Sequence, residues 1–123
     1  MDENAISRQV VDSALKVHSV LGCGLLESVY ETCLAYELTK RGLVVRRQVG
    51  MPVRYENATL EMGFRLDLLI EDKVVVEIKS AEKMLPLYGA QLLTYLKLGG
   101  YKLGLLLNFN TVHLRDGIRR VVN

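Results

Sequence analysis

The strongest constraint on the fold comes from two segments of alternating side chains, residues 64–70 and 74–80, which flank three polar residues. Side chains alternate between the two faces of a strand, so each segment carries one apolar face. A shift of register by one residue would move half of those apolar side chains into solvent. We therefore expect an antiparallel hairpin in which Leu66 lies opposite Ile78, Leu68 opposite Val76, and Ile70 opposite Val74.

The same register gathers charged side chains on the other face of the hairpin. Asp67 is placed opposite Glu77, and Lys79 follows one step along that face. Directly opposed carboxylates repel each other, which a purely structural sheet avoids. A divalent cation between them removes the repulsion, and magnesium prefers carboxylate oxygens and water as ligands. A lysine side chain beside the cation can orient or deprotonate the attacking water. An exposed face with a solvated salt bridge is the alternative.

Two helices are predicted before this hairpin. The first covers residues 4–21, is capped by Asp2 or Asn4, and ends at glycines 22 and 24. The second covers residues 26–41, and Gly42 suits its C-terminal cap. The apolar stripe of the first helix, at helical spacing, consists of Ile6, Val10, Ala14, Val17 and Leu21.

The rest of the chain predicts a sheet with one further helix. Residues 43–80 read as an antiparallel meander with breaks at 50–52, 56–57 and 71–73. Pro86 can begin a third helix that runs to Leu98 and ends at two glycines. The continuous apolar run 103–109 is expected to form a buried strand parallel to residues 74–79, through a right-handed crossover. Residues 112–115 and 118–122 are predicted to form a short final hairpin around Asp116-Gly117.

Composition narrows the class of protein. The chain has 123 residues, half of them hydrophobic, which suits one α/β domain over residues 1–123. Its apolar runs are too short for a bilayer and no signal-like start is present, so we expect no membrane contact and a cytoplasmic location. The net charge is only +2, so nucleic-acid contact would depend on a local patch. Cys23 and Cys33 follow no zinc-binding pattern and are expected to be free, buried thiols.

Four further residues are candidates for the site. Glu27 shares a helical stripe with Tyr30, so we expect its carboxylate in packed surroundings where it needs a partner; an acid favoured by the helix dipole is the alternative. Gln91 and Tyr95 share a helix face that could overlook the hairpin and hold a phosphate, a base or a water. Ordinary polar packing is the alternative for that pair. His18 borders an apolar stripe, where a packed histidine is the alternative to a metal ligand.

These residues, taken together, resemble a known family. Residues 24–30 match the GxxExxY signature of a group of small bacterial and archaeal proteins. Asp67 matches the first acid of the PD-(D/E)XK nuclease superfamily, and residues 77–79 match its (D/E)xK element. Residues 91–95 match the QxxxY helix motif of RecB-like exonucleases. The resemblance runs from about residue 10 to residue 121, and it is specific because all these elements occur in this order and spacing.

The resemblance implies a restriction-endonuclease-like core and a nuclease that hydrolyses phosphodiester bonds in DNA or RNA with Mg²⁺ (or Mn²⁺). In that scheme Asp67, Glu77 and Glu27 are metal ligands and catalytic residues. His18 is a further metal ligand. Lys79 would activate the attacking water, while Gln91 and Tyr95 would assist with substrate. The alternative is a non-catalytic module that binds nucleic acid or protein and retains the nuclease fold. A homodimer, or a protein partner that supplies specificity, stays open.

Overall fold

The computed structural model describes all residues, 1–123, and begins with the two predicted helices. Helix α1 (Glu3–Leu21) is capped by Asp2, whose carboxylate accepts a hydrogen bond from the backbone N–H of Ala5 at 2.8 Å. Helix α2 (Glu27–Lys40) stops just before Gly42, which has the left-handed φ of 88° that ends many helices. Both helices therefore lie where their spacing and caps predict.

Five strands form one sheet in the order β1-β2-β3-β4-β5. Only β3 and β4 run parallel, which confirms the predicted mixed sheet with one crossover strand. Helix α3 (Pro86–Gly99) makes that crossover, as the proline and the two glycines predict. The strands are β1 (Val45–Tyr55), β2 (Ala58–Ile70), β3 (Val74–Lys79), β4 (Leu103–Asn108) and β5 (Ile118–Val122).

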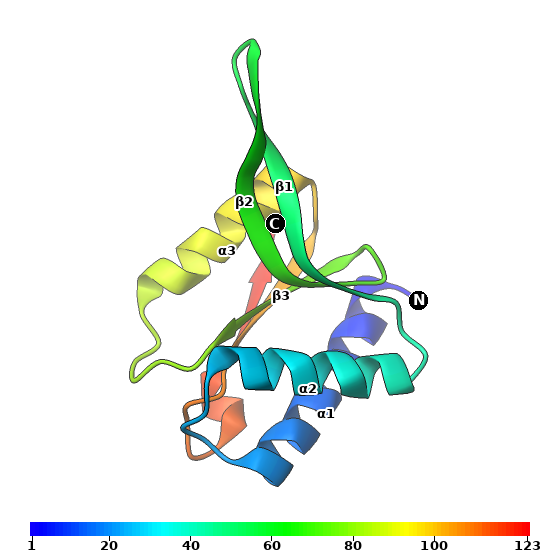
Figure 1. Cartoon of the computed structure of the whole chain (residues 1–123), viewed down its shortest axis with the longest axis vertical. Coiled ribbons are helices and arrows are strands. Elements are labelled where there is room, and N and C mark those ends of the chain that lie inside the picture. Colours follow the sequence, from blue (N-terminus) through cyan, green and yellow to red (C-terminus); the bar gives the residue numbers. More distant parts are fainter.

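The sheet has a layer of helix on each face (Figure 1). Helices α1 and α2 cover one face over a large apolar cluster that includes Leu68, Val76 and Leu105. Helix α3 covers the other face over a smaller cluster that includes Val75 and Leu96. No helix of the structure is both long and apolar enough to cross a membrane.

The β2–β3 hairpin has the predicted register at its closed end only. Leu68 lies opposite Val76 and Ile70 opposite Val74, but the ladder ends there. The predicted pairing of Leu66 with Ile78 is wrong, because β2 turns away from β3 beyond Leu68 to pair with β1 alone. Leu66 consequently packs in the smaller cluster under α3, and not with Leu68.

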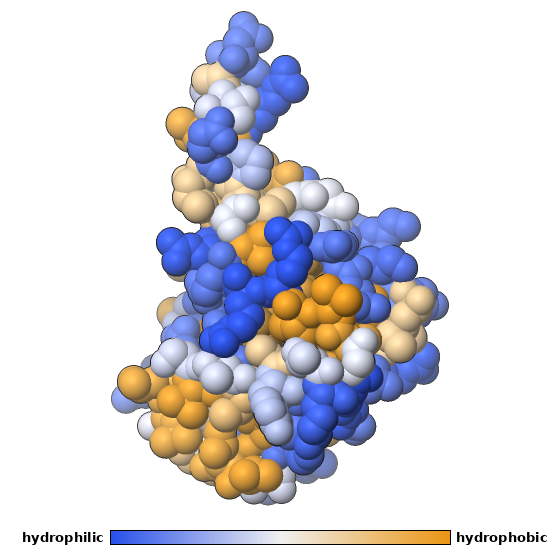
Figure 2. All heavy atoms as spheres, turned by 45° about the vertical axis from the view of Figure 1, so that its right-hand side comes forward, coloured by the Kyte–Doolittle hydropathy of each residue, from blue (hydrophilic) through white to orange (hydrophobic).

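Beyond that point β1 and β2 project from the body as a two-stranded arm (Figure 1). The predicted break at residues 50–52 is wrong, because β1 continues to Tyr55 and absorbs the irregularity as a shift of register between Met51 and Val53. Residues 58–63 of the arm are exposed, and its tip is hydrophilic (Figure 2). The arm thus adds little to either apolar cluster.

Two smaller predictions also need correction. Residues 112–115 form no strand, because the chain makes a 3-10 turn (Leu114–Gly117) and then returns along β4 as β5. The buried Leu114 explains this, since it is drawn inward to pack on the large cluster. Both cysteines are free as predicted, but Cys23 is exposed and Cys33 is only half-buried. Cys23 lies between Gly22 and Gly24, whose positive φ values carry the chain around the turn between α1 and α2.

Candidate functional site

The candidate site lies where β2 and β3 separate. There Ile78 donates its backbone N–H to Asp67 Oδ2 at 2.8 Å, and Asp67 donates its own N–H to Glu77 Oε1 at 3.2 Å. These two bonds replace the ladder bonds that the strands no longer make. Each carboxylate is thereby fixed through one oxygen. Asp67 Oδ1 and Glu77 Oε2 are the oxygens that no backbone N–H takes.

The two acids form an electrostatically costly pair. Glu77 is only 6% exposed, and its burial, followed by the nearby charge of Asp67, raises its pKa to about 9. The charge of Lys79 acts in the opposite direction but more weakly. The ionised pair therefore needs a proton or a cation beside it.

Lys79 lies two residues beyond Glu77 on β3 and so projects to the same side of the sheet. That side is the one covered by α3, because the Lys79 Nζ lies 4.7 Å from the ring centroid of Tyr88 on that helix. The contact is a cation–π interaction, which holds the long side chain without neutralising its charge. The side chain of Lys79 is thereby held on the same side of the sheet as Glu77.

Helix α3 also brings Tyr95 to the carboxylates. The pKa of its hydroxyl is raised by burial and then by the charges of Glu77 and Asp67, so the phenol lies within their field. Its ring stacks on Phe64 of β2, with centroids 4.7 Å apart. Gln91 lies one turn earlier on the helix and is exposed. Of the predicted pair, Tyr95 therefore lies near the carboxylates.

Glu27 does not lie in the packed surroundings expected from its helical stripe. It is exposed, because it is the first residue of α2 and its side chain lies beyond the core. The start of α2 is nevertheless tied to the end of β3, since the Ser80 hydroxyl donates to the Leu25 carbonyl at 2.6 Å. The start of α2 thus lies close to the end of β3 (Figure 1).

Tyr30 fixes the turn that precedes Glu27. Its hydroxyl donates to the carbonyl of Gly22 at 2.7 Å and accepts the backbone N–H of Leu25 at 3.1 Å. Its ring is fully buried and stacks on Phe109, with centroids 4.5 Å apart. Tyr30, the tyrosine of the GxxExxY segment, therefore has a structural role.

His18 is not grouped with the carboxylate pair as a metal-holding cluster. Its Nε2 lies 2.8 Å from the carbonyl oxygen of Thr111, in the loop that follows β4. Its ring faces Phe109, with centroids 6.4 Å apart. The structure therefore brings together Asp67, Glu77, Lys79 and Tyr95, but it does not add His18 to them.

Two residues near the site were not found by the sequence reasoning. Glu31 is 7% exposed and accepts hydrogen bonds from Arg47 and from the Gln48 side-chain amide. The same amide reaches Asp67 Oδ1 at 3.5 Å. The sequence did contain a signal for Glu31, because this acid directly follows Tyr30, which is buried. No local signal marks Gln48, because its partners lie on other elements.

The donor set suits a hard divalent cation. No three His, Cys, Asp or Glu side chains are grouped to hold a metal, so the site offers the two carboxylates of Asp67 and Glu77. Magnesium is commonly held by one or two carboxylates, with water and substrate phosphate in the other positions. The residues therefore fit a cation that is completed by substrate.

The chain is similar to known proteins in sequence and in fold. A family model described as the PD-(D/E)XK nuclease superfamily matches residues 4–121. The structure is similar to the crystal structure of SSO0001, with a TM-score of 0.56 and 19% sequence identity. That match covers 97% of this chain and 59% of the solved chain, and at such identity it shows the fold alone. No curated protein matches the sequence.

Proposed function

Because the chain belongs to the PD-(D/E)XK nuclease superfamily, we propose that it is a nuclease that hydrolyses phosphodiester bonds in DNA or RNA with Mg²⁺ or Mn²⁺. The observation that carries the proposal is the Asp67–Glu77 pair at the point where β2 and β3 separate. A sheet built only for stability gains nothing from a buried acid opposite a second acid. A cation site does.

Asp67 Oδ1 and Glu77 Oε2 would hold the cation, since the other two oxygens are taken by backbone N–H groups. When bound, the cation supplies positive charge that offsets the charge developing on the phosphoryl and leaving oxygens. The backbone bonds hold one oxygen of each carboxylate in place without a metal. Little rearrangement is then needed for binding, which favours affinity.

The surrounding side chains would handle water and substrate. Lys79, on the same side of the sheet as Glu77, would orient the attacking water and, as an ammonium, stabilise charge on the phosphate; as a neutral amine it would take the proton of the water. Tyr95 and, further out, Gln91 would contact the substrate from α3. Glu27 at the start of α2 stays a proposed further ligand, as does His18. Because Nε2 of His18 faces the Thr111 carbonyl, binding would use Nδ1.

The segment from Gly24 to Tyr30 supports placing the chain among the small GxxExxY-type proteins of the RecB-like branch. The partners we propose are nucleic acid and, for specificity, a second copy of the chain or another protein. The exposed edge strand β5 offers a place for such pairing.

The test is a nuclease assay on single- and double-stranded DNA and RNA with Mn²⁺ and with Mg²⁺. We expect Asp67→Asn and Glu77→Gln to reduce cleavage by about 10²-fold or more, because each removes a charged metal ligand. The matched control is Asp72→Asn, an exposed acid on the turn of the same hairpin that pairs with Arg46. This control should cleave like the wild type.

Cleavage that persists in both site variants would contradict the proposal. So would a protein that binds nucleic acid or a protein partner equally well with and without Asp67 and Glu77, yet cleaves nothing. That second result would identify the non-catalytic module.

A further inference from the structure

Gln48 has an unusual backbone for a strand residue. It lies in β1 between Arg47, which pairs with Leu68, and Val49, which pairs with Leu66, but it has no partner of its own on β2. Its φ is 50°, in the left-handed region that residues with a β-carbon rarely adopt. Such a conformation costs free energy and persists only where other contacts hold it.

Those contacts come from the side-chain amide of Gln48. Its Nε2 donates to Glu31 Oε1 on α2 and reaches Asp67 Oδ1 on β2 at 3.5 Å. An amide nitrogen carries two hydrogens, so it can serve both carboxylates at once. The oxygen of Asp67 that it reaches is the one left free by the Ile78 N–H.

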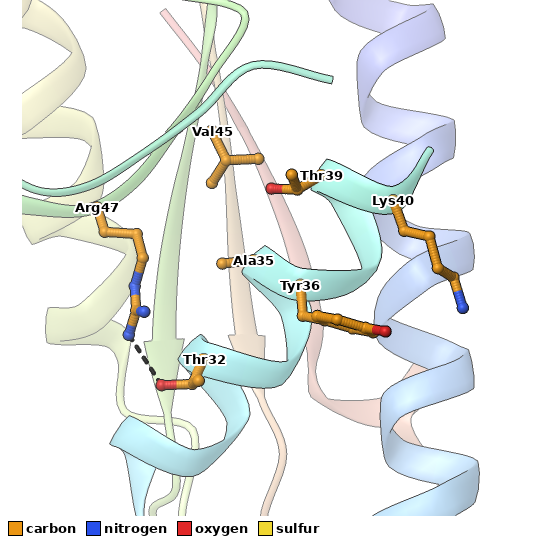
Figure 3. A pocket seen from close by; sticks show the side chains of 7 residues that line it. All are labelled: Thr32, Ala35, Tyr36, Thr39, Lys40, Val45 and Arg47. Atoms are coloured by element: carbon orange, nitrogen blue, oxygen red, sulfur yellow. Dashed lines mark hydrogen bonds between the residues drawn. The ribbon is translucent and has the colours of Figure 1, made fainter. Parts of the chain in front are cut away.

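The far end of this arrangement is anchored by Arg47. Its guanidinium donates to Glu31 Oε2 through Nη2 at 3.0 Å and through Nε at 3.2 Å. It also donates to the Thr32 hydroxyl at 2.8 Å (Figure 3). Arg47 thereby neutralises the buried Glu31, whose second oxygen is left to hold Gln48. Arg47 also lines a surface hollow of about 510 Å³ with residues of α2, and neither Asp67 nor Glu77 lines that hollow.

From this geometry we infer that Gln48 is a positioning residue that orients Asp67 for a divalent cation, with Glu31 and Arg47 as its anchor. The inference rests on the proposed function. A neutral amide suits this task, because it directs a carboxylate without bringing a positive charge that would repel the cation. Groups that orient metal ligands in this way commonly change metal affinity strongly when removed.

The experiment is calorimetric titration of the full chain with Mn²⁺. Gln48→Gly removes the amide but keeps the backbone, because glycine adopts a positive φ without strain. We expect its Mn²⁺ affinity to fall about 10- to 100-fold, while its melting temperature stays level or rises. The matched control is Glu56→Gly, which relieves a φ of 52° at the tip of the arm, far from the carboxylates. Its Mn²⁺ affinity should equal that of the wild type.

Nuclease activity gives a second measurement. The Gln48→Gly protein should recover most of its cleavage rate at saturating Mn²⁺, whereas Asp67→Asn should not, because only the latter lacks a ligand. Equal Mn²⁺ affinity in Gln48→Gly and the wild type would overturn the positioning role and leave the proposed nuclease standing. A loss of affinity that accompanies a lower melting temperature would overturn it too. A wild-type protein that binds no Mn²⁺, alone or with nucleic acid, would overturn both proposals.

Discussion

At the scale of single residues, the ionisation of Glu77 links the site to stability. The carboxyl is buried beside Asp67, and these two causes raise its pKa to about 9 in the folded chain. In the unfolded chain the same group titrates near its ordinary value of about 4.5. Between these values the folded state binds more protons than the unfolded state. Without a divalent cation, the contribution of Glu77 therefore lowers stability as the pH rises through this window.

Glu77→Gln removes this dependence, because its amide stays neutral and its Oε1 can still accept the Asp67 N–H. We expect the variant to gain stability over the wild type in chelator, by at most about 1.4 kcal/mol for each pH unit between roughly pH 5 and pH 8. Urea unfolding at several pH values measures the difference. Added Mn²⁺ should stabilise the wild type and not the variant. Parallel pH profiles for the two proteins would contradict this account of Glu77.

At the scale of elements, Asn108 joins the end of β4 to the start of the loop after β3. It is 2% exposed, and its Oδ1 accepts the N–H groups of Ala81 and Asn110 while its Nδ2 donates to the Ala81 carbonyl. The backbone of Lys79 is held next to it, since its carbonyl accepts the N–H of Phe109 at 2.9 Å. The position of Lys79 thus depends on the ends of two neighbouring strands.

Asn108→Ala should lower the free energy of unfolding by about 2 kcal/mol or more, because it leaves part-buried backbone groups without partners. The rate of hydrogen exchange should increase more at the Ala81 amide than at the amides of the β3 core. The control is Asn123→Ala, which removes one exposed side-chain bond to Tyr101 and should stay within about 0.5 kcal/mol of the wild type. An unchanged exchange rate at Ala81 would show that Asn108 does not hold this loop.

At the scale of the whole molecule, the arm and the body are distinct parts of one sheet. The arm, which pairs only β1 with β2, projects from the body (Figures 1 and 2). The body holds both apolar clusters and the carboxylates. The ring of Phe64, stacked on Tyr95, marks where the arm joins the body. The outer part of the arm should therefore be dispensable for folding.

Replacing residues 54–59 by Asn-Gly tests this separation. Val53 and Leu60 lie opposite each other, and Asn-Gly suits a two-residue hairpin turn between such partners. We expect the free energy of unfolding to change by less than about 1 kcal/mol and the Mn²⁺ affinity to be retained. A large loss of stability would mean that the arm tip supports the body. The same protein, assayed with nucleic acid, would report whether the arm contacts substrate.

The order and type of nearly every element could be read from the sequence, because these features depend on local spacing. The cap at Asp2, the Pro86 start of α3 and the apolar run of β4 each act within a few residues. Alternation along β2 and β3 also fixed the register at Leu68 and Val76. The same alternation predicted that Asp67 and Glu77 lie close together.

Only the tertiary structure decided how the site is built. The separation of β2 from β3 depends on the competing pairing with β1, so alternation could not predict that Leu66 changes sides. The exposure of Glu27 and the burial of Glu31 depend on where α2 lies against the sheet. Gln48 meets Glu31 and Asp67 across 17 and 19 residues of chain, and no local pattern records contacts between segments that only folding brings together.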